Sequence, residues 1–336
     1  MPPDRGVERI AVLRANALGD LVFTLPALDA LRAAYPTAEI ILLGREWHAA
    51  LLSGRPGPVD RVAVAGETPE HLAGESWDLA LQMHGGGAWS NPYVSGLGAR
   101  VTAGCRDVDA PALDRCIPYV YYQPEVSRWL EVAGLVGAPP VTLEPRLAVT
   151  DADREAAALA VDEDGPLAVL HPGATDPRRR WPASSFAALG DALATRGLRI
   201  ALTGVEEERE LVAEVAMGMA APALDLAGAL SLGGLVGLLE RAEVVVANDT
   251  GPLHVAGAVG TPSVGVYWIG NLVNGGPLVR ARHRPLPDFR VACPVCGVDC
   301  TRGECGHDAS FVAGVTVAEA EAACHTLLAD AAPAPA

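Results

Sequence analysis

The sequence predicts an α/β protein made of two parallel-sheet domains. Short β-branched runs alternate with amphipathic helical stretches, the pattern expected of parallel strands joined by helices that cover both faces of a sheet. Half of the residues are hydrophobic but only 5% are aromatic, which favours helices packed tightly on sheets over an aromatic-rich β-sandwich. A chain of 336 residues is long for one core, so the usual size of a domain favours two.

The first domain is expected to span residues 7–155. Its first strand runs through a polar turn, 14–20, into an amphipathic helix over 21–34. A second helical pattern, over 123–136, is closed by the Pro-Pro pair at 139–140. The strands expected in this domain are 10–13, 39–43, 61–64, 79–82 and 100–103.

The second domain is expected over 156–310, after a polar interval that contains a helix start near Asp151 and an acidic turn at 162–165. Its expected strands are 167–170, 199–203, 223–225, 244–247 and 263–267, with helices over 184–195, 206–217 and 232–240. Residues 311–330 are expected to carry a C-terminal helix, for which packing back on the first domain is one arrangement. The Pro- and Ala-rich end, 331–336, is expected to fray.

The charge of the chain argues against a polyanionic partner. Its formal net charge is -16, and its 25 basic residues are all arginines. Such a chain repels nucleic acid on average, and no basic stretch extends beyond Arg178-Arg179-Arg180. A small anionic ligand needs only one locally positive pocket and stays compatible with this charge.

No segment of the sequence predicts secretion or membrane insertion. Residues 1–8 are polar, the apolar segment after them is short, and no run of about 20 apolar residues occurs. A cytoplasmic protein is therefore expected, with any membrane contact peripheral and made through a lipid-linked acceptor.

Two strand–turn–helix segments are the candidate binding sites. Residues 249–254 follow the expected strand 244–247 and open a helix, and residues 14–20 occupy the same kind of position in the first half. The free N–H groups and the positive dipole end of a helix N-terminus suit a phosphate group. Because the two turns lie in separate halves, they suggest a ligand held between domains.

Three blocks of the sequence carry a family resemblance. They are Leu18-Gly19-Asp20 with Thr24-Leu25-Pro26-Ala27-Leu28, His171-Pro172-Gly173 with Arg180-Trp181-Pro182, and Asn248-Asp249-Thr250-Gly251-Pro252-Leu253-His254 with Gly260-Thr261-Pro262. In this order they resemble the heptosyltransferase family of glycosyltransferases, glycosyltransferase family 9. The resemblance implies the GT-B fold, in which two Rossmann-like domains face an inter-domain cleft, with the acceptor on the first domain and the nucleotide-sugar donor on the second.

The reaction implied by the resemblance is a metal-independent, inverting transfer of a sugar from a nucleotide diphosphate to a hydroxyl of a glycan or lipid-linked acceptor. ADP-heptose and a lipopolysaccharide core are the substrates it suggests. A nucleotide-sugar epimerase or hydrolase on the same plan, and a non-catalytic nucleotide-sugar binding protein, stay open as alternatives. NAD-dependent oxidoreduction is disfavoured because neither turn has the Gly-x-Gly-x-x-Gly pattern.

Asp20 is the candidate catalytic base. An acceptor hydroxyl must lose its proton as it attacks the anomeric carbon, and a carboxylate beside it can take that proton. The alternative is an N-cap role, because Asp is favoured at helix starts and here precedes an apolar-periodic helix. The resemblance matches this Gly-Asp pair, Gly19 and Asp20, to the catalytic position.

The loop His84-Gly85-Gly86-Gly87 is the other candidate on the acceptor side. It resembles the oxyanion loop of some esterases, but the chain has no Gly-x-Ser-x-Gly elbow to partner it. Glycines let the backbone approach an acceptor, so His84, Gly85 and Gly86 are assigned to acceptor binding together with Gly19. A plain flexible loop is the alternative.

On the donor side, the resemblance assigns Asp249, Thr250, Gly251, Leu253 and His254. The turn would hold the diphosphate through backbone N–H groups and the Thr250 hydroxyl, and Gly251 would permit close approach. His254 would contact a phosphate oxygen, or serve as a cap or core histidine. An ionised Asp249 would repel a diphosphate, so its side chain is expected to turn toward backbone amides or a ribose hydroxyl.

Arg180 is the candidate cation for the departing diphosphate, because charge that develops on a leaving group is best met by a fixed positive group. Its neighbours Arg178 and Arg179 are alternatives for the phosphate contact, and the resembled family often has lysine at this position.

Three further donor contacts are expected in the second half. The turn with His171 and Gly173 follows the first strand of the second domain, so its backbone is expected to line the site. Glu206, or its neighbour Glu207, is expected to accept from ribose hydroxyls, as an acid in a related position does in the resembled enzymes. A charged first turn of a helix is the alternative for this acidic run.

The cysteines form one dense cluster and three isolated positions. Cys293, Cys296, Cys300 and Cys305, with His307 close behind, lie in a Pro- and Gly-rich segment compatible with a structural zinc site. Free or redox-active thiols are the alternative, and disulfides are not expected in a reducing cytoplasm. The transfer chemistry requires no cofactor, and Cys105, Cys116 and Cys324 are predicted to be isolated small hydrophobes.

Overall fold

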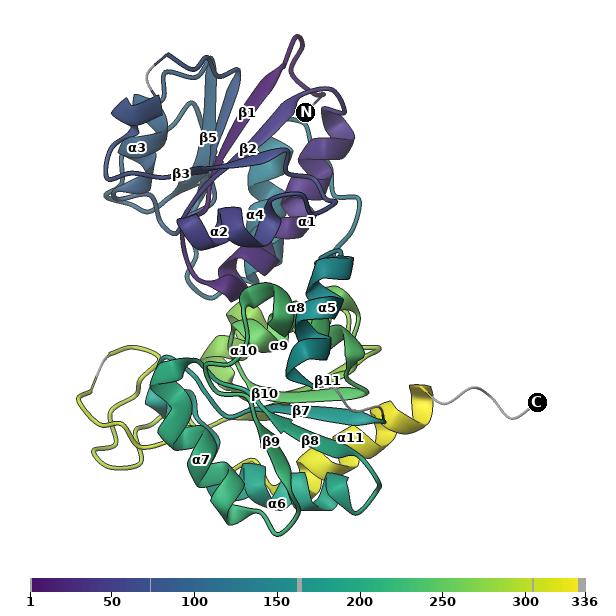
Figure 1. Cartoon of the computed structure of the whole chain (residues 1–336). Coiled ribbons are helices and arrows are strands. Elements are labelled where there is room, and N and C mark those ends of the chain that lie inside the picture. Colours follow the sequence, from purple (N-terminus) through teal and green to yellow (C-terminus); the bar gives the residue numbers. More distant parts are fainter. Residues whose placement is uncertain (1, 73, 162–164, 304, 332–336) are drawn as a thin grey trace. The chain divides into compact units, whose positions relative to one another are not determined.

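The computed structural model describes residues 2–72, 74–161, 165–303 and 305–331. The chain divides into two compact units, residues 1–148 and 149–336, and each contains a parallel sheet covered by helices, which confirms the predicted α/β class (Figure 1). The acidic turn at 162–164 and the tail 332–336 lie outside the described residues.

The first domain contains a six-stranded sheet whose neighbouring strands all pair in parallel. Its strands are β1 (Arg9–Leu13), β2 (Glu39–Gly44), β3 (Arg61–Val64), β4 (Leu79–Gln82), β5 (Val101–Arg106) and β6 (Arg115–Pro118). They lie in the order β3-β2-β1-β4-β5-β6. The central strands are almost entirely buried, because helices cover both faces of a parallel sheet.

The helices of the first domain are α1 (Leu18–Ala34), α2 (Glu46–Leu52), α3 (Ser90–Gly96) and α4 (Glu125–Leu135). Helices α1 and α4 pack against each other on one face of the sheet, and α3 packs on β4 and β5 from the other (Figure 1). The apolar cluster beneath α3 includes Trp77, Tyr93 and Val94.

The second domain has the same kind of sheet, with the order β12-β11-β10-β7-β8-β9 and parallel pairing throughout. Its strands are β7 (Leu167–His171), β8 (Arg199–Leu202), β9 (Ala223–Asp225), β10 (Val244–Asn248), β11 (Ser263–Trp268) and β12 (His283–Asp288). Counted from the first strand of each domain, the two strand orders are identical, so the chain carries two copies of one Rossmann-like topology.

The helices of the second domain are α5 (Asp151–Ala160), α6 (Ala183–Ala194), α7 (Arg209–Gly218), α8 (Leu232–Arg241), α9 (Gly251–Val259), α10 (Ile269–Gly275) and α11 (Val317–Ala331). Figure 1 shows α6, α7 and α11 on one face of the sheet and α5, α8 and α9 on the other. The expected helix 206–217 is observed as a 3-10 turn, Glu206–Glu208, that leads into α7.

The domain boundary lies before α5, not after residue 155 as the sequence predicts. Helix α5 packs on α8 so closely that a Cβ atom at Gly237 would lie 2.2 Å from the backbone oxygen of Asp153. This contact assigns residues 151–155 to the second domain.

The expectation that the C-terminal helix packs back on the first domain is also corrected. Helix α11 contacts α6 and strands β10, β11 and β12. Its residues Ala320, Cys324 and Leu327 belong to the hydrophobic core of the second domain.

Strands β6 and β12 are absent from the sequence prediction because prolines interrupt their patterns. Strand β6 ends in Pro118, and β12 contains Pro285 and Pro287. Both strands lie at sheet edges, where a residue without an N–H can be accommodated.

Each sheet has one point where the strand order reverses direction: between β1 and β4 in the first domain, and between β7 and β10 in the second. Ligands of open α/β sheets bind at this switch point, beyond the carboxyl ends of the strands. The turn 14–20 follows β1, and His84 comes shortly after β4; His171 ends β7, and Asp249 follows β10. The candidate residues of each domain therefore meet at its switch point.

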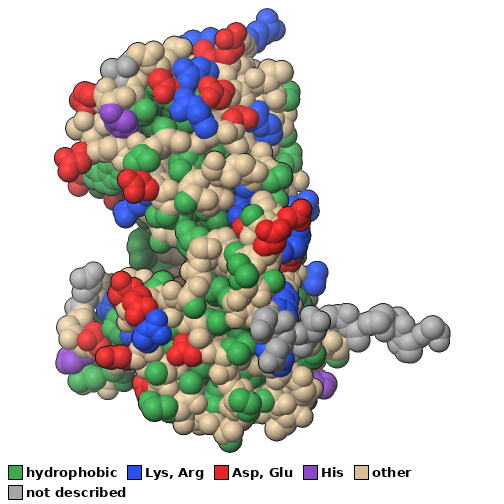
Figure 2. Space-filling model, viewed as in Figure 1, with side chains coloured by type: hydrophobic (Ala, Val, Ile, Leu, Met, Phe, Trp, Pro, Cys, Tyr) green, Lys and Arg blue, Asp and Glu red, His purple; other side chains and the backbone are tan. Residues whose placement is uncertain are grey.

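None of the helices in the described ranges combines the length and the apolar character that a bilayer crossing needs. On the face shown in Figure 2, acidic and basic side chains are interspersed among apolar and neutral ones. That face carries no broad basic area of the kind that a nucleic-acid partner would require.

Candidate active site

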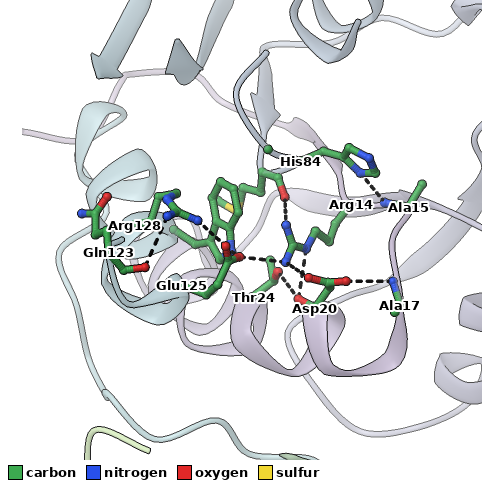
Figure 3. Close-up of polar contacts among 12 residues, drawn as sticks. Arg14, Ala15, Ala17, Asp20, Thr24, His84, Gln123, Glu125 and Arg128 are labelled. Carbon is green, nitrogen blue, oxygen red and sulfur yellow. Dashed lines mark hydrogen bonds and ion pairs between the residues drawn. The ribbon is translucent and has the colours of Figure 1, made fainter. Parts of the chain in front are cut away.

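The first half of the site is centred on Asp20, which Arg14 orients at the carboxyl end of β1 (Figure 3). Arg14 Nη2 donates to Asp20 Oδ1 at 2.9 Å, and the Ala17 N–H donates to Asp20 Oδ2 at 3.0 Å. The Arg14 side chain is 1% exposed, whereas that of Asp20 is 31% exposed. The carboxylate is thus held in one orientation and still reaches solvent.

Asp20 is not the N-cap of its helix. Helix α1 begins at Leu18, so Asp20 is its third residue, and its side chain accepts from the N-cap residue Ala17. This is the acidic half of a capping box. The helix-start role that the sequence offered as an alternative therefore coexists with an accessible carboxylate.

A buried network of charged and aromatic side chains holds Arg14 in place. Arg14 donates to Glu125 Oε2 at 3.0 Å and to the Met83 carbonyl at 2.7 Å, and its guanidinium lies 4.7 Å from the ring centroid of Trp129. Trp129 Nε1 donates to the same Glu125 oxygen at 2.8 Å, and Arg128 pairs with the other one. Because a buried charge needs a partner, this pairing holds the Arg14 guanidinium, and through it the Asp20 carboxylate, in place.

The sequence analysis missed Arg14, Glu125 and Arg128. A charged residue directly after the apolar strand β1 was the one available signal for Arg14. Glu125 lies 111 residues further along the chain, and only the fold brings it to Arg14.

The loop after β4 is shaped by a buried glutamine. Gln82 Nε2 donates to the carbonyls of His84 and Gly85 at 2.9 and 3.0 Å, and Gln82 Oε1 accepts from the Cys105 N–H at 3.2 Å. Gly85 has a φ of 70°, a conformation that glycine adopts without strain. Hydrogen bonds from Gln82 therefore hold the start of this loop in a defined conformation.

His84 joins this loop to the Asp20 turn. Its Nδ1 accepts from the Ala15 N–H at 3.2 Å (Figure 3). Burial, with a contribution from the nearby Arg14 guanidinium, lowers the pKa of His84 to about 4, so the ring is neutral at pH 7.

Gly19 is buried in the first turn of α1, and the Gly86 carbonyl accepts from the Asp107 N–H at 2.7 Å. The structure thus gathers the predicted acceptor residues at one edge of the first sheet.

In the second domain, Asp249 lies at the carboxyl end of β10 with its charge already paired. Asp249 Oδ2 accepts from Arg179 Nη1 at 3.3 Å, and Oδ1 lies 3.1 Å from His254 Nε2. The sequence analysis expected backbone amides or ribose as the partners of this carboxylate. In the described structure Arg179 and His254 hold it, and a carboxylate paired in this way repels an anion less.

The start of α9 has no side-chain cap in the described structure. Thr250 is the N-cap residue with an extended backbone, and its side chain makes no capping hydrogen bond. The amide of Gly251, at the first helical position, has no helical acceptor and can face an anion. Leu253, in contrast, packs its side chain with Ala247 and Tyr267, so it can contact a donor only through its backbone.

The three consecutive arginines have different partners. Arg178 donates to Asp176 from both Nε and Nη2, at 2.9 and 2.7 Å, and Arg179 pairs with the Asp249 carboxylate. Arg180 donates from Nε to the Ala174 carbonyl at 2.9 Å, and its two Nη groups have no partner among the described residues. Arg180 is therefore the arginine best placed to take a phosphate.

Asn248 connects the parts of the donor site. Its Oδ1 accepts from the Trp181 N–H at 2.9 Å, and its Nδ2 donates to the Pro172 carbonyl at 2.7 Å. The fully buried side chain thereby ties the end of β10 to the arginine loop and to the turn after β7. It was quoted in the family motif but given no role by sequence.

His171 and Gly173 lie beside a glutamate that the sequence analysis did not choose. His171 Nδ1 lies 3.1 Å from Thr203 Oγ1, its Nε2 lies 3.8 Å from Glu208 Oε2, and burial lowers the pKa of His171. A Cβ atom at Gly173 would lie 2.1 Å from Glu208 Oε1, so the Glu208 carboxylate packs directly on this glycine. Glu208 therefore borders the donor turn.

Glu206, the predicted ribose acceptor, lies outside this group. Its side chain is 66% exposed and pairs with Arg209 at 2.6 Å. The 3-10 turn rotates the three consecutive glutamates to different directions, and only the third, Glu208, lies near His171.

The structure brings three of the four predicted cysteines together, and His307 takes the place of Cys300 in the cluster. The ligand atoms of Cys293, Cys296, Cys305 and His307 all lie within 4.8 Å of one another, a grouping that could hold a metal ion. Cys300 lies 3.8 Å from Cys305 by their Sγ atoms but is not part of that set. Hydrogen bonding from the Cys296 backbone amide lowers the pKa of the Cys293 thiol to about 6.

All seven cysteines lie within the described residues and are free thiols. Cys105 and Cys324 are buried, as isolated small hydrophobes should be, and Cys116 is partly buried. Burial raises the pKa of both the Cys105 and the Cys324 thiol to about 12, so neither is reactive at neutral pH.

Two Rossmann-like domains in series are the architecture of GT-B glycosyltransferases, and here one switch point carries an accessible carboxylate and the other a helix start without a side-chain cap. Comparison with known proteins agrees. Residues 68–281 match glycosyltransferase family 9 (heptosyltransferase). The chain belongs to this family.

Individual relatives cover most of the chain. The lipopolysaccharide heptosyltransferase 1 of Pseudomonas aeruginosa is 27% identical over 319 residues, which is 87% of each chain. Among solved structures, the glycosyl transferase family 9 protein of Veillonella parvula superposes with a TM-score of 0.81 at 20% identity, covering 98% of this chain and 99% of that one. The E. coli ADP-heptose lps heptosyltransferase II gives 0.76 at 20% identity, covering 96% and 99%.

Proposed function

We propose that the protein transfers heptose, with inversion, from ADP-heptose to a hydroxyl of a lipopolysaccharide-core-like acceptor. The family supports glycosyl transfer, and the relatives named as lipopolysaccharide and ADP-heptose heptosyltransferases support the sugar, the nucleotide and the acceptor. The observation that carries the mechanism is the Asp20 carboxylate, oriented by Arg14 and still accessible.

In this mechanism the acceptor oxygen attacks the anomeric carbon of the donor while Asp20 takes its proton. The bond from the anomeric carbon to the β-phosphate oxygen breaks, and its electron pair leaves on ADP. Arg14 keeps one edge of the Asp20 carboxylate in place, so the accessible part faces the hydroxyl. Gly19, His84, Gly85 and Gly86 supply the surface on which the acceptor rests.

The second domain binds the donor in this proposal. The Gly251 amide and the open start of α9 take the diphosphate, together with Thr250 and the free Nη groups of Arg180. Arg180 meets the charge that develops on the departing ADP, so the transfer step itself needs no metal ion. His171 and Gly173 line the base or ribose side, and His254 acts by holding Asp249.

The alternatives are less well supported. An epimerase or hydrolase uses no acceptor hydroxyl, and a pure binding protein needs no carboxylate, whereas family 9 membership favours transfer. The cytoplasm is the proposed compartment, since seven free thiols fit a reducing environment. We also propose that any membrane contact is peripheral and made through the acceptor.

The decisive assay combines the purified protein with ADP-heptose, with and without a heptose-deficient lipopolysaccharide core. We expect ADP and a heptosylated core only when both substrates are present. ADP-mannose, GDP-mannose and UDP-glucose serve as matched donors. Release of ADP at the same rate without acceptor would favour a hydrolase, and faster transfer from another nucleotide would overturn the proposed donor.

Glu208 is expected to be the ribose acceptor in place of Glu206. Replacing Glu208 with Gln retains the shape but weakens charge-assisted hydrogen bonds to ribose hydroxyls, so the donor KM should rise about tenfold, equivalent to about 1.4 kcal/mol. Glu206→Gln is the matched control, because its side chain is exposed and bound to Arg209. Steady-state kinetics on both variants test this, and a larger effect at Glu206 would reverse the assignment.

A further inference from the structure

We propose that Cys293, Cys296, Cys305 and His307 bind one zinc ion, which holds the segment between β12 and α11 against the arginine loop of the donor site. The metal site lies outside the transfer chemistry and is tested by metal content alone, whereas its effect on donor binding rests on the proposed ADP donor. It also replaces the ligand set suggested by sequence, in which Cys300 was the fourth ligand.

The spacing of the four ligand atoms fits tetrahedral zinc. A Zn–S bond of about 2.3 Å places two ligand atoms of a tetrahedron about 3.8 Å apart. All four ligand atoms lie within 4.8 Å of one another, and Cys293 Sγ lies 3.8 Å from His307 Nδ1. Small shifts of side chains would therefore close the site around an ion.

The backbone already forms a metal-binding turn around the first pair of ligands. The Cys293 N–H donates to the Val298 carbonyl at 2.8 Å, and the Gly297 N–H donates to the Cys293 carbonyl at 2.9 Å. Gly297 has a φ of 75°, and a short antiparallel bridge joins Ala292 to Asp299. The turn thus presents Cys293 and Cys296, a Cys-x-x-Cys pair, to one point.

The second pair of ligands comes from Cys305 and His307, separated by one residue. The Cys300 Sγ lies 3.8 Å from the Cys305 Sγ but outside the set of four ligand atoms that all lie within 4.8 Å of one another. Its thiol donates to the Val298 carbonyl at 3.5 Å. Three thiolates and one imidazole form a set that prefers zinc among the common divalent ions, with iron as the main competitor.

The segment has few other means of staying folded. Between β12 and α11 the structure shows no helix or longer strand among the described residues, and Val295 is 61% exposed. A metal ion commonly replaces a hydrophobic core in such a segment, because binding energy becomes folding energy.

One end of the segment is bonded to the end of β11, and the other is bonded to the arginine loop of the candidate donor site. On one side, Trp268 Nε1 donates to the Arg290 carbonyl at 2.6 Å. On the other, the Ser310 hydroxyl donates to the Arg180 carbonyl, and the Phe311 N–H donates to the Arg178 carbonyl, each at 2.7 Å. Metal binding between these two ends would therefore restrict the motion of the backbone of the arginine loop, residues 178–180.

The test is the metal content of the full chain, purified without a polyhistidine tag and without added metal, by inductively coupled plasma mass spectrometry. We expect about one zinc per chain. Cys296→Ser and His307→Ala should lose it, and Cys300→Ser, the matched control, should keep it. Replacing zinc with Co²⁺ should give the visible absorption of a tetrahedral thiolate site in the wild type and in Cys300→Ser.

A second readout tests the link to the donor site. Isothermal titration of ADP should show a dissociation constant raised about fivefold in Cys296→Ser and unchanged in Cys300→Ser. The proposed zinc site would be overturned if the wild-type protein held almost no metal, held iron in place of zinc, or contained a disulfide among the four ligands. It would also be overturned if Cys300→Ser lost the metal while His307→Ala kept it. Equal ADP affinity with and without zinc would show that the metal does not stabilise the arginine loop for ADP binding.

Discussion

Replacing Asp20 with Asn is expected to lower kcat about a thousandfold, within the range of general acid–base catalysis, while the dissociation constant for ADP stays nearly unchanged. Asn keeps the size of the side chain and an acceptor for the Ala17 N–H, but it cannot take a proton from the acceptor hydroxyl. The measurement is steady-state transfer to the core acceptor alongside ADP titration.

The control for this variant lies on the same helix. Asp29 is partly buried, and burial raises the pKa of its carboxyl, but it lies nine residues beyond Asp20 along α1, away from the β1 turn. Asp29→Asn should therefore leave kcat unchanged. Because Asn at position 20 also weakens the pair with the buried Arg14, melting temperatures of both variants must accompany the kinetics. Near wild-type turnover by a folded Asp20→Asn protein would remove Asp20 from the mechanism.

Replacing Arg180 with Ala is expected to lower kcat/KM by about a hundredfold to a thousandfold, because the departing diphosphate loses its fixed cation. The two Nη groups of Arg180 have no partner within the described residues, so their removal costs the folded protein little. Lys at this position restores the charge without the bidentate fork and should recover part of the activity.

Arg178→Ala is the discriminating control, because its guanidinium is already bound to Asp176. We expect a loss of less than about tenfold there, since the loop is disturbed but the phosphate contact remains. Initial rates over a matrix of donor and acceptor concentrations compare the variants. A greater loss for Arg178 than for Arg180 would exchange their roles.

The architecture was largely predictable from local patterns. Continuous apolar runs such as 39–43 and 244–247 indicated buried parallel strands, and they appear as β2 and β10 within one residue of the expected ends. The edge strands β6 and β12 escaped prediction because Pro118, Pro285 and Pro287 break the pattern that marks a strand.

The first half of the site was predictable only in part. Asp20 and His84 stand out in the sequence because each follows a strand, where parallel sheets present functional groups. Arg14 and Glu125, which orient Asp20, do not stand out, because their pairing spans 111 residues.

The sequence by itself determined the two-domain α/β class, the strands that end at the switch points and the helix start within residues 249–254. Periodicity, glycine and helix-start preferences act over only a few residues. Only the tertiary structure decided that Glu208 and not Glu206 borders Gly173, and that His307 joins the cysteines in place of Cys300. It also decided that, among the described residues, the Nη groups of Arg180 stay unpaired. These choices depend on which side chains from distant or tightly turned segments come within a few ångströms of each other. Local preferences carry no information about such distances, whereas strand order and close packing set them.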